Sequence, residues 1–189
     1  MKKRALMVVD LQNDFCPGGS LAVPEGDKIV PVVNRLVRKF AMAHLPIFAT
    51  RDWHPADHCS FQKQGGPWPP HCIQGTRGAE FHPRLRLPDD AAIVSKATSP
   101  EKDAYSGFDG TDVGPQLKRA GVDHIVVCGL ATDYCVKATA LDALKEGFRV
   151  TVVLDGVRGV NLQPDDSDKA IDEMRDAGIV VTPGTEVTP

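Results

Sequence analysis

Six short apolar runs, most of them followed by a segment with helical spacing, constrain the fold of this chain more than any other feature. Short apolar runs bounded by turn residues are typical of strands buried on both faces of a parallel sheet. Strands that alternate with helices indicate βαβ units. We therefore predict an α/β fold with a doubly wound, six-stranded parallel sheet and helices on both faces. The predicted strands are residues 5–9, 46–50, 91–95, 124–128, 149–154 and 179–181.

Helices are expected over residues 26–43, 112–120, 132–146 and 164–177. In the first of these, apolar residues recur at spacings of three and four, which indicates an amphipathic helix. Pro31 is compatible with that helix only near its first turn. A glycine follows each of the other three segments, as is common after the last turn of a helix.

Length and composition limit the class of protein. A chain of 189 residues suits a single domain over residues 1–189, with ordinary hydrophobic (42%) and charged (25%) content. The net charge of −3 does not indicate a basic surface for nucleic-acid binding. No apolar run is long enough to span a membrane. The five cysteines fit neither a disulfide framework nor a CxxC zinc site. We therefore expect a cytoplasmic protein.

Residues 51–90 differ in character from the rest of the chain. They are rich in proline and glycine, yet they contain both tryptophans and four of the six histidines. Loops of this length in a compact domain are usually functional or disordered, and disordered segments are poor in aromatic residues. We therefore predict an ordered, functional insertion. The tail over residues 183–189 is polar and expected to be loose.

Three reactive residues follow predicted strands, where ligands bind in doubly wound sheets. Asp10, Lys96 and Cys135 come after the first, third and fourth strands. With Thr132 or Asp133 as N-cap, Cys135 would lie in the first turn of a helix, which favours a thiolate and offers N–H groups to an oxyanion.

A carboxylate can deprotonate a thiol and later protonate a leaving group, and a lysine beside both would stabilise the charges. Each residue also has an ordinary interpretation. Cys135 could be a small buried apolar residue, Asp10 a loop or capping carboxylate, and Lys96 a solvated surface lysine. Asp155, at the end of the fifth predicted strand, is interpreted as structural.

Asp52 and His54, two residues apart, could point to one side of an extended segment. With His71 they would offer an oxygen and two nitrogens to zinc, manganese or iron(II). Surface histidines in a polar loop are the alternative. His58 and His82 lie in the same insertion and cannot be ranked, whereas His44 and His124 are interpreted as structural. The loop aromatics Phe15, Trp68 and Tyr105 either line a pocket for a small flat ligand or pack beneath the loops.

Several segments together resemble the nicotinamidases and pyrazinamidases, which are isochorismatase-like cysteine hydrolases. The resemblance runs from about residue 5 to residue 182. Its most specific parts are Asp-Trp-His-Pro and Trp-Pro-Pro-His, which resemble the metal site of that branch. The segments are residues 8–15, 52–55, 68–72, 95–96 and 129–136.

The resemblance implies that Asp10, Lys96 and Cys135 form a catalytic triad and that Asp52, His54 and His71 bind one divalent metal ion. Zinc is the first choice for that metal, with iron or manganese as alternatives. Some members carry another histidine ligand where this chain has Ser60, so the fourth ligand would be Ser60 or water.

The implied substrate is the small molecule nicotinamide, hydrolysed through a Cys135 thioester in NAD salvage, and pyrazinamide is plausible too. Phe15 and Trp68 would flank its ring, with Tyr105 and Ala131 also in contact. A cis peptide between Leu130 and Ala131 would direct the N–H groups of Ala131 and Cys135 into an oxyanion hole.

Two competing functions remain from the sequence. A related hydrolase of carbamoyl or ureido substrates would keep the triad but would not need the three metal ligands. A non-catalytic metal- or ligand-binding α/β protein would simply bury Cys135. No nucleic-acid or membrane partner is expected. The sequence does not decide whether the protein forms a homo-oligomer.

Overall fold

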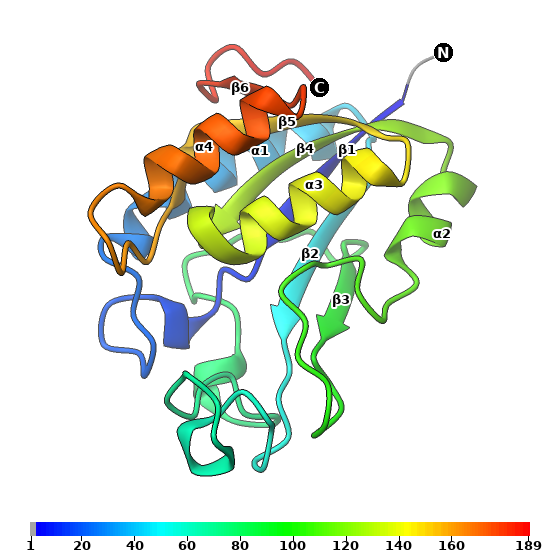
Figure 1. Ribbon diagram of the computed structural model, residues 1–189. Coiled ribbons are helices and arrows are strands. Elements are labelled where there is room, and N and C mark those ends of the chain that lie inside the picture. The colour runs from blue at the N-terminus through cyan, green and yellow to red at the C-terminus, as the bar shows by residue number, and fades with distance from the viewer. Residues whose placement is uncertain (1–2) are drawn as a thin grey trace.

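The computed structural model describes residues 3–189, and its six strands form one sheet in the order β3-β2-β1-β4-β5-β6. All neighbouring strands are parallel. The predicted α/β fold with a doubly wound parallel sheet is therefore confirmed (Figure 1). The strands are β1 (Lys3–Val9), β2 (Ile47–Asp52), β3 (Ala92–Lys96), β4 (Val122–Leu130), β5 (Arg149–Arg158) and β6 (Val180–Thr182).

Helices cover both faces of the sheet. In Figure 1, α3 (Lys137–Lys145) and α4 (Asp166–Asp176) lie in front of the sheet, and α1 (Val30–Met42) lies behind it. The short α2 (Val113–Arg119) packs with α3 and α4 in the same hydrophobic cluster. Side chains of β1 contribute to the hydrophobic core on both faces of the sheet: Leu6 packs with α1, and the adjacent Met7 packs on the opposite face. This alternation is what a doubly buried central strand requires.

The predicted helix over residues 26–43 is two elements. Residues Gly26–Ile29 form a 3₁₀ turn, and α1 begins at Val30. Pro31 therefore lies in the first turn of α1, as expected, because a residue there needs no intrahelical N–H donor.

The fifth strand is longer than predicted, and Asp155 lies within it rather than after it. The Asp155-Gly156 pair reads as a turn in sequence, but β5 continues through an irregular register and pairs Val157 with Gly129. The Oδ1 of Asp155 accepts the N–H of Gly184 at 2.6 Å, which agrees with a structural role.

The predicted helix over residues 132–146 is also divided. Residues Thr132–Val136 form a wide π-helical turn, and α3 begins only at Lys137. Neither Thr132 nor Asp133 is an N-cap: Ala131 takes that place with an extended backbone. The Asp133 carboxylate instead accepts the backbone N–H groups of Val160 and Asn161. Cys135 therefore lies in the π turn and not in the first turn of an α-helix.

The insertion between β2 and β3 is mostly irregular, with 3₁₀ turns at Gln62–Gln64 and Arg77–Ala79. It nevertheless buries Phe61 completely and pairs with the rest of the chain through isolated bridges such as Gln12 with Phe81. The tail is less loose than expected, because Val187 is buried and its carbonyl accepts a bond from Lys39 Nζ at 3.0 Å. Within residues 3–189, no helix combines the length and apolarity needed to cross a membrane.

Candidate active site

The carboxyl ends of β1, β3 and β4 bring three of the predicted site residues together. Asp10 follows β1, Lys96 ends β3, and Cys135 lies in the turn after β4. The Nζ of Lys96 lies 3.0 Å from Asp10 Oδ2 and 3.4 Å from Cys135 Sγ. All three side chains are buried. A thiol, a carboxylate and an ammonium in mutual contact can carry out nucleophilic acyl transfer.

Close packing of β1 against β4 supports this arrangement. Gly129 has a φ of +124°, and a Cβ there would lie 2.0 Å from the Val9 carbonyl oxygen. Only glycine therefore fits beside the end of β1. Directly after Val9, Asp10 itself has a φ of +45°, a left-handed conformation that is uncommon outside glycine and is found at functional sites.

Asp10 is completely buried, and its two carboxylate oxygens have different partners. The Thr50 hydroxyl donates to Oδ1 at 2.7 Å, whereas Oδ2 faces Lys96. Burial raises the pKa of Asp10, and the Lys96 charge and the Thr50 hydrogen bond offset that rise only in part. The raised pKa brings the carboxyl closer to the range in which it can both accept and return a proton. Thr50 is not among the predicted site residues, because a threonine inside an apolar strand resembles a core residue in sequence.

The protonation state of Cys135 differs from the prediction. Sequence position suggested a thiolate, but burial raises the pKa of the Cys135 thiol well above its ordinary value, and the nearby carboxylates raise it further. The Lys96 ammonium acts in the opposite direction without reversing the shift. The thiol therefore holds its proton at rest, so its activation needs a base, and Asp10 is the adjacent candidate.

Lys96 also contacts Asp52, which the sequence did not indicate. Its Nζ donates to Asp52 Oδ1 and to the Ala104 carbonyl, the latter at 3.1 Å. Burial alone would lower the pKa of Lys96, but the Asp10 and Asp52 carboxylates raise it well above its ordinary value. Burial would raise the pKa of Asp52, but Lys96 and the neighbouring histidines hold it below its ordinary value. Lys96 is therefore a buried cation shared by two carboxylates.

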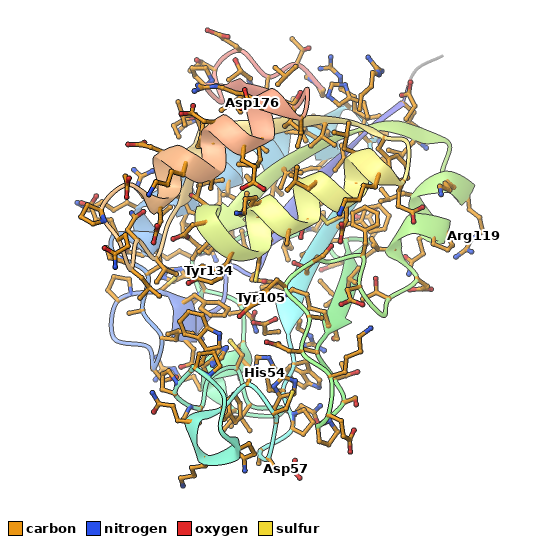
Figure 2. The ribbon with its side chains drawn as sticks, viewed as in Figure 1. His54, Asp57, Tyr105, Arg119, Tyr134 and Asp176 are labelled. Carbon is orange, nitrogen blue, oxygen red and sulfur yellow. The ribbon has the colours of Figure 1, made fainter. Side chains whose placement is uncertain are left out.

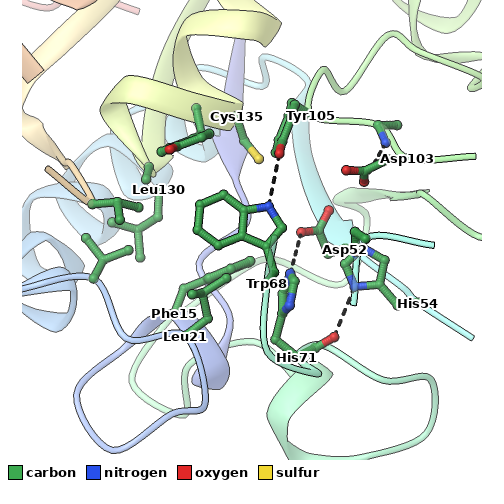
Figure 3. Close-up of a pocket in the computed structure, with 16 residues that line it drawn as sticks. Phe15, Leu21, Asp52, His54, Trp68, His71, Asp103, Tyr105, Leu130 and Cys135 are labelled. Carbon is green, nitrogen blue, oxygen red and sulfur yellow. Dashed lines mark hydrogen bonds and ion pairs between the residues drawn. The ribbon is translucent and has the colours of Figure 1, made fainter. Parts of the chain in front are cut away.

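Asp52, His54 and His71 form the predicted O,N,N cluster, with ligand atoms within 4.8 Å of one another (Figure 3). The Nδ1–H of His54 donates to the His71 carbonyl at 3.0 Å, and that of His71 donates to the Pro69 carbonyl at 2.8 Å. These bonds leave each Nε2 as the free ligand atom. Burial lowers the pKa of His54 to about 4 and also lowers that of His71, so both rings are neutral at pH 7. This donor set fits a divalent metal such as zinc.

Ser60 and His58 lie beside this cluster and bond to each other. The His58 ring packs against His54, with centroids 4.3 Å apart, and its Nδ1 lies 2.7 Å from Ser60 Oγ. The other nitrogen, Nε2, lies 3.1 Å from the Lys102 carbonyl. Both nitrogens of His58 are thus engaged by protein, while Ser60 lines the pocket. His82 lies outside this pocket, where its Nδ1 accepts the Arg84 N–H.

One pocket is lined both by Cys135 and by the histidine cluster. Phe15, Trp68, Tyr105 and Ala131 all line it; the sequence predicts these four residues as substrate contacts. The Trp68 indole N–H donates to the Tyr105 hydroxyl at 3.0 Å, as Figure 3 shows. Figure 2 places His54 in the insertion, with Tyr105 and Tyr134 between it and α3. The pocket is also lined by residues not predicted as substrate contacts: Leu21, Val23, Asp103, Ala104, Leu130, Tyr134 and Val160.

The backbone before Cys135 matches a further implication of the resemblance. The peptide bond between Leu130 and Ala131 is cis. Ala131 and Cys135 both line the pocket.

The chain is similar over nearly its whole length to proteins of known family and structure. The isochorismatase domain model matches residues 4–186. The chain is 46% identical to the nicotinamidase of Escherichia coli strain K12 over 94% of this chain and 93% of that protein. The crystal structure of the pyrazinamidase of Pyrococcus horikoshii in complex with zinc aligns with a TM-score of 0.92 and 55% identity, covering 96% of this chain and 99% of that one. N-carbamoylsarcosine amidase from Thermoplasma acidophilum aligns with a TM-score of 0.82 and 32% identity over 99% of both chains.

Proposed function

The chain belongs to the isochorismatase family, and we propose that it is a metal-dependent amidase that hydrolyses nicotinamide to nicotinate and ammonia. One observation carries the proposal: Lys96 contacts both Asp10, beside the nucleophile, and Asp52, within the O,N,N cluster. The pocket is lined both by Cys135 and by Asp52, His54 and His71, so it would offer a cysteine to the carboxamide of a ligand and a metal site to the rest of that ligand. Reaction in this pocket would serve NAD salvage in the cytoplasm, and the five free thiols are compatible with a reducing compartment.

Asp52, His54 and His71 would hold the metal, and zinc is the first choice because neutral imidazoles and a carboxylate suit it. When bound, the metal would supply a Lewis-acidic position for the pyridine nitrogen of nicotinamide. Phe15 and Trp68 would then contact the flat ring and direct its carboxamide toward Cys135. Pyrazinamide has the same flat shape and a ring nitrogen in the equivalent place, so we expect it to be a substrate too.

The chemistry begins with the buried thiol. Asp10 accepts the Cys135 proton, and the sulfur attacks the carboxamide carbon to form a tetrahedral intermediate. The N–H groups of Ala131 and Cys135 stabilise its oxyanion. Asp10 then returns the proton to the departing nitrogen, and ammonia leaves as the thioester forms. Water attacks the thioester with Asp10 as base, which releases nicotinate and restores the thiol, while Lys96 stabilises the ionised Asp10.

Activity measurements test the reaction and the metal site separately. The assay is ammonia release from nicotinamide by the zinc-loaded protein, before and after chelation, with Cys135→Ala as the blank. We expect release that requires both Cys135 and the metal, and Cys135→Ala should keep its full metal content. Turnover that survives removal of the metal would discard our account of ring recognition. Equal turnover in Cys135→Ala would discard the mechanism.

A hydrolase of carbamoyl or ureido substrates is the second candidate, since N-carbamoylsarcosine amidase shares the fold. Such an enzyme would use Asp10, Lys96 and Cys135 without needing the O,N,N cluster. Folded, metal-loaded protein that releases no ammonia from nicotinamide, but does release it from a carbamoyl amino acid, would favour this candidate.

A further inference from the structure

Gln12 is a completely buried amide in the loop after β1, two residues beyond Asp10. Its Nε2 donates to the carbonyls of Asp52 and Ala79 at 2.8 and 2.9 Å. Its Oε1 accepts the Asp52 backbone N–H at 2.8 Å. The side chain therefore uses both of its donors, and it contacts both backbone polar groups of Asp52.

The two bonds between Gln12 and the Asp52 backbone take the place of strand pairing with β1, because β1 stops pairing with β2 before Asp52. Strand β1 pairs with β2 from Leu6 to Val8, and Asp10 then turns away in its left-handed conformation. On its other side, Asp52 is in register with Lys96 of β3. Without Gln12, the Asp52 N–H and C=O that face the end of β1 would be buried and unpaired, at a cost of about 1–3 kcal/mol for each group. Gln12 thus fixes the backbone of the residue whose side chain faces His71 and Lys96.

The third bond connects the same amide to the insertion. That bond goes to the Ala79 carbonyl. Two backbone bonds join the same two segments: the Asn13 N–H donates to the Glu80 carbonyl at 2.9 Å, and the His82 N–H donates to the Leu11 carbonyl at 2.8 Å. One loop therefore holds the end of β2 and the segment that follows His71. The end of β2 carries Asp52, and the held segment belongs to the insertion that carries His71, so one loop is bonded to both parts of the chain that supply the O,N,N cluster.

We propose that Gln12 is a positioning residue that sets the metal affinity of the site by fixing Asp52 relative to His71. This inference rests on the metal site of the proposed function. Gln12 itself does not reach the pocket, and it makes no hydrogen bond to Cys135 or Lys96. Loss of its side-chain amide should therefore weaken metal binding more than it changes the nucleophile. A buried glutamine with only a structural role would instead lower global stability and leave the affinity of the folded protein unchanged.

The test compares two variants that each lose buried hydrogen bonds. Gln12→Met keeps the side-chain length and removes all three bonds. Thr151→Val is the matched control, because it removes the 2.8 Å bond to His124 Nε2 between β4 and β5, away from the site. Zinc dissociation constants are measured by competition with a chelator, at a temperature where both proteins are folded by circular dichroism. The alkylation rate of Cys135 by iodoacetamide is measured on the metal-free proteins.

We expect Gln12→Met to bind zinc about 10–100-fold more weakly, as is typical when a partner of a metal ligand is lost. Thr151→Val should stay within about twofold of the original affinity, and Cys135 alkylation should change little in either variant. Unchanged affinity in folded Gln12→Met, or equal weakening in Thr151→Val, would overturn the inference alone. Failure of the unaltered protein to bind zinc would overturn the proposed metal site as well.

If Gln12→Met does not fold, Gln12→Glu takes its place. Glutamate keeps the acceptor for the Asp52 N–H but loses the donors to the two carbonyls. The same criterion applies: weaker zinc binding supports the inference, and affinity within twofold of the original contradicts it.

Discussion

Replacing Lys96 by methionine should destabilise the metal-free protein strongly, because it leaves two buried carboxylates without their cation. Lys96 is 1% exposed, with Asp10 Oδ2 at 3.0 Å and Asp52 Oδ1 also in contact. Removing one partner of a buried ion pair typically costs about 3–5 kcal/mol. For a chain of this size, that loss corresponds to a fall in melting temperature of roughly 6–20 °C. Methionine nearly matches the length of the lysine side chain, so cavity formation contributes little.

The effect should depend on pH in a defined direction. The pKa of Lys96 is raised in the folded protein, so its stabilisation is fully present below pH 10.5, its ordinary value, and is lost as pH rises through the folded pKa. The lowered pKa of Asp52 gives stability that is present above about pH 3.8 and is lost as pH falls through its folded pKa. In Lys96→Met both carboxyls should have raised pKa values and take up protons on folding. The difference in unfolding free energy between the unaltered protein and Lys96→Met should therefore become smaller as pH falls from 7 toward 5.

Urea unfolding of EDTA-treated proteins at pH 5, 6, 7 and 8 measures this gap. Lys118→Met is the control, since its ion pair with Glu146 is about half exposed and should contribute at most about 1 kcal/mol. A loss below about 1 kcal/mol for Lys96→Met at pH 7, or a gap that widens on acidification, would refute the argument that Lys96 neutralises the two carboxylates.

Substitutions at three further positions test other parts of the site. His54→Ala should remove zinc and weaken nicotinamide binding, and full metal occupancy by elemental analysis would rule out His54 as a ligand. Tyr105→Phe removes the acceptor of the Trp68 indole N–H, a bond worth about 1 kcal/mol, so KM should rise about fivefold with little change in kcat. Thr50→Val should lower kcat about tenfold by freeing Asp10 Oδ1, while Thr50→Ser should keep most activity; equal kcat in the two variants would contradict a role for the hydroxyl.

The fold was predictable because its main signals are periodic. Doubly buried strands contain continuous apolar runs, such as residues 5–9 and 125–128, and their alternation with helical segments leaves few topologies. The errors occur where tertiary contacts override local signals. Asp155 and Gly156 look like a turn, but the partner strand and the Gly184 N–H keep them within β5. Likewise, the predicted helix over residues 132–146 begins as a π turn around Cys135, which the sequence pattern does not distinguish from an α-helix.

Candidate site residues were identifiable by type and by position at strand ends, but their electrostatics were not. Chain order indicates that Asp10, Lys96 and Cys135 meet at one edge of the sheet. It does not indicate that Lys96 also contacts Asp52, or that burial raises the pKa of Cys135 despite the adjacent lysine. Gln12 was identifiable only as part of a motif, because its partners are backbone groups, which leave no trace in sequence.

These contacts make the pocket one electrostatic unit rather than two adjoining sites. A buried charge is tolerated only when it is paired and hydrogen-bonded. Asp10 meets that requirement through Thr50 and Lys96, and Lys96 meets it through Asp10, Asp52 and the Ala104 carbonyl. The two carboxylates that pair with Lys96 are therefore Asp10, beside Cys135, and Asp52, within the O,N,N cluster. A neutral residue in place of Lys96 would remove the cation from both carboxylates at once. Lys96→Met should therefore affect both the stability of the protein and the reactivity of the Cys135 thiol.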